Sequence, residues 1–174
     1  MTSRTSVYRL TSQRYATGHL KTENVASTRK AIASLLEKYR AAHAPIVHIV
    51  HQVPAGAPIF TPDTDLAMEF AELTPQDGEK VIAKQQAGSF TGTDLDAFIK
   101  TTNRVKVVLT GYMAHVCVST TARQAAERGY DVVLAEEAIG DRDIPGASAA
   151  DVVRMTLAEL GDAFGSVVQA DDIK

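Results

Sequence analysis

Residues 105–123 of the chain read VKVVLTGYMAHVCVSTTAR. The first six of them, residues 105–110, are nearly all apolar, which is typical of a strand buried on both faces of a sheet. The helical pattern of residues 118–128 ends at Gly129, and glycine commonly follows the last turn of a helix. A buried strand followed at once by a helix is the repeating unit of parallel α/β folds, so this stretch predicts a fold of that class.

The same alternation of strand and helix runs through the rest of the chain. Strands are predicted at residues 7–10, 46–50, 81–84, 105–110, 131–134 and 166–169. Helices are predicted at residues 24–42, 94–100, 118–128 and 147–160, the second with Thr93 as its N-cap. This alternation predicts an α/β fold with a six-stranded parallel sheet and helices on both faces, formed by residues 1–174 as a single domain.

The composition sets limits on partners and location. Apolar residues make up 45% and charged residues 22% of the chain, an ordinary balance for a globular protein. The formal net charge of -3 gives no sign of a nucleic-acid or membrane partner, and no apolar run approaches the roughly 18 residues that span a bilayer. The single cysteine excludes an internal disulfide and favours a cytoplasmic location. The first 22 residues lack acids, as mitochondrial transit peptides do, but the same stretch fits the first strand.

Polar and reactive residues gather where the predicted strands end. In open parallel sheets, ligands bind beyond the carboxyl ends of the strands. That rule places residues 11–13, His51, Lys84 and residues 111–117 along one edge of the sheet. Residues 51–78 hold four of the six prolines and show little periodicity. They are predicted to form a long, partly ordered loop, and loops of that length are usually functional.

Cys117 lies where the helix after the fourth predicted strand begins. Unpaired backbone N–H groups and the positive end of the helix dipole favour a thiolate there, and the thiolate is the nucleophilic form of cysteine. The same amides can stabilise the oxyanion that forms when a thiolate attacks a carbonyl. The alternative interpretation is a small apolar residue that packs the helix on the sheet.

Residues 111–123 resemble the nucleophile region of the isochorismatase-like cysteine hydrolases, which has the form Gly-x-x-Thr-x-x-Cys-Val-x-x-Thr-Ala-Arg. Gly129-Tyr130 follows, as in that family, and residues 81–84 with Ser89-Phe90 are similar to its lysine-bearing segment. The resemblance covers about residues 10–169. It implies a doubly wound, Rossmann-like fold of three layers and assembly into homo-oligomers.

The resemblance also implies a catalytic Cys–Asp–Lys constellation, in which Cys117 is the nucleophile and Lys84 the lysine. It implies a non-proline cis peptide bond between Tyr112 and Met113, which would turn a backbone N–H toward the oxyanion. Ala114 stands where the family commonly has threonine, and we expect this change to affect orientation more than bond breaking.

The aspartate of this constellation is missing. Thr11 stands at its position, and no aspartate precedes Asp63. A threonine hydroxyl cannot accept a proton at neutral pH, so three explanations stay open. Lys84, once desolvated, acts as the base or pairs with the thiolate; or His51 or His115 replaces the aspartate; or hydrolysis is lost and the pocket only binds a ligand.

We therefore predict a hydrolase of a small amide or related C–N bond that works through an acyl-enzyme on Cys117. The alternative is a catalytically impaired protein of the same fold that binds a small molecule or serves in assembly. Isochorismate hydrolysis is disfavoured because the resemblance links that reaction to the aspartate. Nicotinamidase activity is disfavoured because it needs a metal: His48 and His51 have no carboxylate between them, and side chains three apart on a strand point to opposite faces. No metal or other cofactor is predicted.

The substrate is predicted to be a small, partly hydrophobic molecule. Its pocket is expected to be lined by Gln13, His51, Phe60, Phe90 and His115. Asp141-Arg142-Asp143, ahead of Pro145, is interpreted as a loop with an internal ion pair and without a catalytic part.

Overall fold

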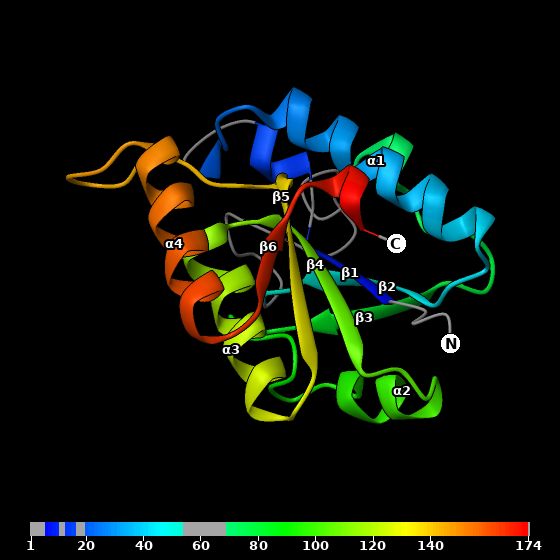
Figure 1. Cartoon of the computed structure of the whole chain (residues 1–174). Coiled ribbons are helices and arrows are strands. Elements are labelled where there is room, and N and C mark those ends of the chain that lie inside the picture. The colour runs from blue at the N-terminus through cyan, green and yellow to red at the C-terminus, as the bar shows by residue number, and fades with distance from the viewer. Residues whose placement is uncertain (1–5, 11–12, 17–19, 54–68, 174) are drawn as a thin grey trace.

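The computed structural model describes residues 6–10, 13–16, 20–53 and 69–173 of the chain. Within them, the strands are β1 (Ser6–Leu10), β2 (Ile46–His51), β3 (Lys80–Lys84), β4 (Lys106–Tyr112), β5 (Asp131–Gly140) and β6 (Ser166–Val168). They form one six-stranded sheet in the order β3-β2-β1-β4-β5-β6, and every neighbouring pair is parallel (Figure 1). The chain starts in the middle of the sheet and extends it first on one side and then on the other. The parallel α/β architecture predicted from the sequence is confirmed.

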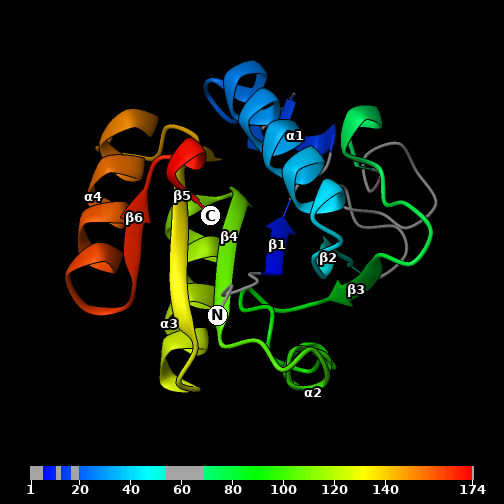
Figure 2. The same ribbon diagram turned by 45° about the vertical axis from the view of Figure 1, so that its right-hand side comes forward.

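Helices cover both faces of the sheet (Figures 1 and 2). One face carries α1 (Val25–Ala41) and the short helices η1 (Gln13–Ala16), η3 (Ala71–Leu73) and η5 (Ala170–Asp172). The other carries α2 (Leu95–Thr101), α3 (Ser119–Glu127) and α4 (Ala149–Ala163). Each face has its own apolar core, and the buried aliphatic residues of the sheet divide between the two because successive side chains along a strand point to opposite faces.

β5 is longer than the sequence predicts, because it continues to Gly140 instead of ending at Leu134. The exposed pair Glu136-Glu137 interrupts its apolar run, so the sequence pattern does not indicate that the strand continues. β6 pairs only with residues 133–135 of β5, so the two glutamates lie beyond the part that β6 covers. β4 goes on pairing with this outer part of β5 after a shift of register between Leu109 and Gly111.

The four predicted helices start one or two residues later than expected, and two of these starts show a local cause. α3 begins at Ser119, because Ala114–Val118 form a π-helical turn, η4, between β4 and α3. The N-cap of α2 is Asp94 and not Thr93. The Thr93 hydroxyl donates to the Ser89 carbonyl oxygen at 2.5 Å and accepts only a long bond, 3.4 Å, from the Leu95 N–H.

The topology brings the ends of several strands to one edge of the sheet. Leu10 of β1 lies beside Gly111 of β4, and His51 of β2 lies beside Lys84 of β3. The turn that carries Cys117 follows β4 directly. In the part of the chain that the structure describes, no helix is long and apolar enough to cross a membrane.

Candidate active site

Cys117 lies in the η4 turn, directly before α3. The Tyr112–Met113 peptide bond, where β4 ends, is cis, as the resemblance implies. The Met113 carbonyl oxygen accepts the N–H groups of Val116 and Val118, both at 3.2 Å, and so closes the turn around the cysteine. The thiol is buried, in the same apolar cluster as Ala114.

Lys84, the last residue of β3, is a buried lysine at the same edge of the sheet as Cys117. Its side chain is almost completely buried, lies close enough to Cys117 for the sulfur to affect its pKa, and donates to the Ala87 carbonyl oxygen. Burial lowers the pKa of Lys84, because the ammonium ion loses its hydration, although the neighbouring Cys117 sulfur opposes this shift. The lysine is therefore easier to deprotonate than one at the surface.

His51 lies beside Lys84 in the register of β2 and β3 and is half-buried. Burial, and secondarily the positive charge of Lys84, lowers the pKa of His51. The imidazole is therefore neutral at physiological pH and able to accept a proton at the edge of the site.

Tyr15 of η1 is a member of this cluster that the sequence did not single out. Its buried ring packs on Tyr112, with the ring centroids 5.2 Å apart. Burial raises the pKa of the Tyr15 phenol, and so do the nearby Cys117 and Asp141. The phenol is thus a neutral group close to the thiol. Its place shortly after the end of the first strand is the one signal in the sequence that could have identified it.

Asp141 directly follows β5 and is buried, contrary to its interpretation as part of a loop ion pair. Its Oδ2 accepts the His115 backbone N–H at 2.9 Å and faces the His115 Nδ1 at 2.6 Å. Its Oδ1 accepts the Arg142 N–H at 2.8 Å. Because a carboxylate only accepts, Nδ1 of His115 carries a proton and donates it to Asp141. Arg142 itself donates from its guanidinium to the Asp143 carbonyl oxygen.

Other predicted residues have different positions. Thr11 and Phe60 lie outside the described residues, and Gln13 is described only as the first residue of η1. Phe90 is buried in the core around α3, stacked on Tyr130 with centroids 6.0 Å apart, so packing accounts for it.

His48 has a structural place. Its fully buried ring contacts Glu69 Oε2 at 3.0 Å and Glu79 Oε2 at 2.8 Å. Glu79 in turn receives two hydrogen bonds from Arg40 of α1. Among the described residues, no group of three or more His, Cys, Asp or Glu side chains is suited to hold a metal ion.

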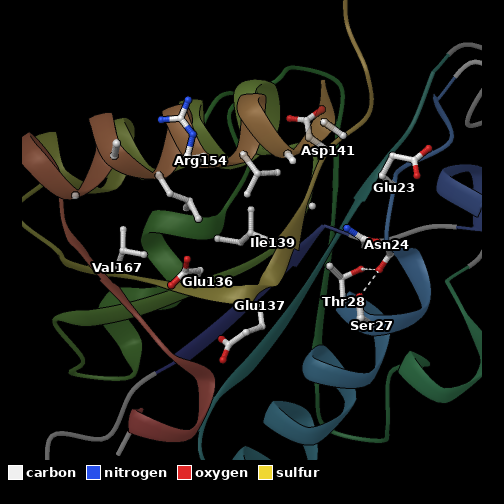
Figure 3. A pocket seen from close by; sticks show the side chains of 17 residues that line it. Glu23, Asn24, Ser27, Thr28, Glu136, Glu137, Ile139, Asp141, Arg154 and Val167 are labelled. Carbon is white, nitrogen blue, oxygen red and sulfur yellow. Dashed lines mark hydrogen bonds between the residues drawn. The ribbon is translucent and has the colours of Figure 1, made fainter. Parts of the chain in front are cut away.

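A large cavity of about 880 Å³ lies over the outer part of β5, between α4 and the start of α1 (Figure 3). Its lining includes Asp141 and Glu137 but neither Cys117 nor Lys84. A smaller pocket of about 410 Å³ between α3 and α4 is lined by His115. Asp141 in the lining of the larger cavity and His115 in the lining of the smaller pocket are therefore joined by a hydrogen bond.

The fold and this edge of the sheet define a parallel α/β protein with a buried cysteine and a buried lysine where the strands end. Residues 11–172 match the family model of the Isochorismatase domain. The secreted isochorismatase effector Isc1 of Verticillium dahliae is 58% identical over 159 residues, which cover 91% of this chain and 84% of that protein. The chain therefore belongs to the isochorismatase family of hydrolases.

Two further similarities bear on the fold and the chemistry. An isochorismatase from Pseudomonas putida KT2440 has a crystal structure that superposes with a TM-score of 0.95 and 29% identity, covering 99% of this chain and 91% of that one. N-carbamoylsarcosine amidase of Arthrobacter sp. is 37% identical over 102 residues, which cover 58% of this chain and 36% of the amidase.

Proposed function

We propose that the protein hydrolyses a small amide or related C–N bond through an acyl-enzyme on Cys117, with Lys84 as the base in place of an aspartate. The observation that carries the proposal is the burial of Lys84 and Cys117 close to each other at the edge of the sheet, since Cys117 affects the pKa of Lys84. The similarity to N-carbamoylsarcosine amidase supports a C–N bond as the target.

The first half-reaction forms the acyl-enzyme. Lys84, as the free amine that its burial favours, takes the proton of the Cys117 thiol. The thiolate attacks the carbonyl carbon and forms a C–S bond, the electron pair of the C=O bond moves to oxygen, and a backbone N–H of the turn that carries Cys117 stabilises this oxyanion. The C–N bond then breaks while the Lys84 ammonium returns the proton to the leaving nitrogen.

The second half-reaction needs a base for water. His51 is neutral and lies beside Lys84, so either group is suited to take the proton of the attacking water. The water oxygen bonds to the carbonyl carbon, the C–S bond breaks, and the proton held by the base returns to the sulfur. Carboxylic acid and free thiol are the products.

The test compares wild-type protein with Lys84→Met and Cys117→Ala. We expect wild-type Cys117 to react with iodoacetamide at pH 7 faster than a free thiol, because Lys84 takes its proton, and Lys84→Met to lose about tenfold at pH 7 while reaching the same rate at high pH. An amide or aldehyde probe should give a covalent adduct by mass spectrometry in the wild type and none in Cys117→Ala. A wild-type thiol without enhanced reactivity and without an adduct would instead support the impaired protein that only binds or assembles.

Hydrolysis of isochorismate is the second candidate, because the relative with 58% identity is named an isochorismatase effector. The two candidates differ in their need for the thiol. Turnover of isochorismate that survives Cys117→Ala would favour this second activity, whereas amide turnover that disappears in the same variant would favour the first.

Cytoplasmic location and a homo-oligomeric state stay predictions. The single cysteine supports a reducing location, but the Verticillium relative is named a secreted protein. Fractionation of cells that express the whole natural protein tests the location. Light scattering at micromolar concentration tests assembly, and a mass of one 18.6 kDa chain would contradict it.

A further inference from the structure

We propose that Asp141 is a positioning residue of the Cys117 site, which acts through His115 to hold the turn that carries the nucleophile. This inference rests on the proposed function, because a turn needs accurate placement only if its thiol reacts. It assigns a site role to a carboxylate that the family resemblance does not include.

The contacts of Asp141 are those of a fixed anchor. Its side chain is completely buried and accepts three hydrogen bonds, two from His115 and one from the Arg142 N–H. Its backbone carbonyl oxygen accepts the Glu23 N–H at 2.9 Å, which ties the same residue to the segment before α1. A buried carboxylate with this many donors is held in one orientation, because each bond offsets part of its lost hydration.

The anchor acts on the turn of the nucleophile. His115 is the second residue of Ala114–Val118, the turn that contains Cys117. Asp141 Oδ2 binds both the backbone N–H and the ring of His115, so it restrains the path of the chain and the side chain together. A change at Asp141 therefore moves the start of the turn.

A second observation places Asp141 on the side of the thiol. The buried Tyr15 phenol is close enough to both Cys117 and Asp141 for each to affect it electrostatically. Tyr15 also packs on Tyr112, the last residue of β4. The carboxylate, the phenol and the thiol thus form one neighbourhood.

Accurate placement has a large effect on rate. Lys84 can take the proton only while the thiol stays within hydrogen-bond distance, and a displacement of about 1 Å in such a site costs about 100-fold. Asp141→Asn keeps the size of the side chain but replaces one of its two acceptor oxygens by a donor, so the side chain can no longer accept from His115 and from the Arg142 N–H together.

The experiment measures the pH profile of Cys117 alkylation in Asp141→Asn, with Asp143→Asn as the matched control. Asp143 is the next carboxylate of the same loop, and its Oδ1 accepts the Ala149 N–H at the start of α4. We expect Asp141→Asn to lose 10- to 100-fold at pH 7 and to recover at high pH, where hydroxide ionises the thiol without Lys84. The control should lower thermal stability without changing the profile.

Other titratable groups near His115 have to be separated from this effect. Across the pocket between α3 and α4, His115 shares the lining with Asp151, Arg154 and Glu159. Glu159→Gln should therefore leave the alkylation profile unchanged. If Asp141→Asn does not fold, His115→Phe removes the ring contact alone and should give a smaller loss in the same direction.

The outcomes distinguish the two proposals. A wild-type thiol without enhanced reactivity overturns the proposed function and this inference with it. A reactive wild-type thiol with the same pH profile in Asp141→Asn and His115→Phe overturns the positioning role and leaves the proposed function standing.

Discussion

Burial at the end of β3 is the reason why we propose Lys84 as the base where a carboxylate is missing. Its ammonium form loses hydration at the end of β3, so the free amine is favoured at a lower pH than at the surface. An aspartate beside it would have the opposite effect, because an opposite charge stabilises the ammonium form. The threonine at position 11 and a lysine that serves as base are therefore mutually consistent.

Thr11→Asp tests this consistency. If Lys84 is the base of the natural protein, the new carboxylate takes over the proton transfer, and the acidic limb of the rate profile should move down by more than about one pH unit, since aspartate ionises near pH 4. The profile of amide hydrolysis between pH 5 and 9 measures the shift. Thr11→Asn, of the same size without the charge, should leave the limb in place. Hydrolysis that exists only in Thr11→Asp would show that the natural site is disarmed.

Single residues were predictable from the sequence where a local pattern marks them. Cys117 follows a buried strand and Lys84 ends another, so both could be placed at one edge of the sheet. The Asp141–His115 pair could not be predicted, because nothing local distinguishes Asp141 from Asp143 on the same loop. Tyr15 was missed for the same reason: its partners come from β4 and from the loop after β5.

At the scale of elements, the sequence predicted the order of strands and helices better than their ends. Apolar runs identify the buried middle of β5, but Glu136 and Glu137 resemble the start of a loop. Their partners explain why the strand continues: Glu136 accepts from the Gln169 side chain and Glu137 from the Ala170 N–H. Those contacts come from the chain after β6, which a local pattern cannot show.

The outer part of β5 also limits what can be built beside the nucleophile turn. A Cβ at Gly140 would lie 2.8 Å from Tyr112 Cε1 and 2.9 Å from Thr22 Cγ2. Both neighbours are buried. We therefore expect Gly140→Ala to lower the free energy of unfolding by about 1–3 kcal/mol through overpacking, and to slow Cys117 alkylation because the ring of Tyr112 must move.

Urea unfolding and iodoacetamide kinetics measure these two effects. Gly161→Ala, within α4, is the matched control. A Cβ at Gly161 would meet only the Val167 side chain, at 3.2 Å. There the helix preference of alanine over glycine, about 1 kcal/mol, offsets the tight contact. Equal effects of the two variants on the alkylation rate would contradict a specific link between β5 and the turn.

At the scale of the whole molecule, the sheet order explains how distant segments meet at one edge. Starting in the middle and extending to both sides places β1 next to β4, so the end of β1 lies beside Gly111, shortly before the turn that carries Cys117. Side chains connect α1 with β2 and with the residue directly before β3. Arg40, His48 and Glu79 do this with hydrogen bonds of 2.7–2.9 Å.

This network makes the fold sensitive to acid. Burial alone would raise the pKa of Glu79. Hydrogen bonds from Arg40, from the Gln76 N–H and from His48 outweigh burial and lower this pKa to about 2. The unfolded chain binds a proton near pH 4.5, so stability is present above that pH and is lost as the pH falls toward 2. Glu79→Gln should be less stable than wild type at pH 7 by about 2 kcal/mol, and the difference should shrink by pH 3. A constant difference in urea unfolding at both pH values would contradict this assignment.

The loss of stability at high pH has a different origin, because it comes from two tyrosines. Burial raises the pKa of Tyr15, and burial together with the hydrogen bond to Asp96 raises that of Tyr130 to about 12. Unfolded tyrosines release their protons near pH 10, so above that pH the unfolded state binds fewer protons and stability falls as the pH rises. For the buried Tyr15 the loss should be about 1 kcal/mol per pH unit. Lys84 opposes it only up to its unfolded value of 10.5, because its pKa is lowered.

Tyr15→Phe isolates this effect, because the ring stays and only the ionisable hydroxyl is removed. The variant should unfold in urea with a free energy that declines less between pH 9 and 11 than that of the wild type. Tyr130→Phe should flatten the decline to a smaller degree, since Tyr130 is only partly buried. If the Tyr15→Phe curve stays parallel to the wild-type curve over this range, the phenol is already exposed in the folded protein and does not belong to the buried neighbourhood of Cys117 and Asp141.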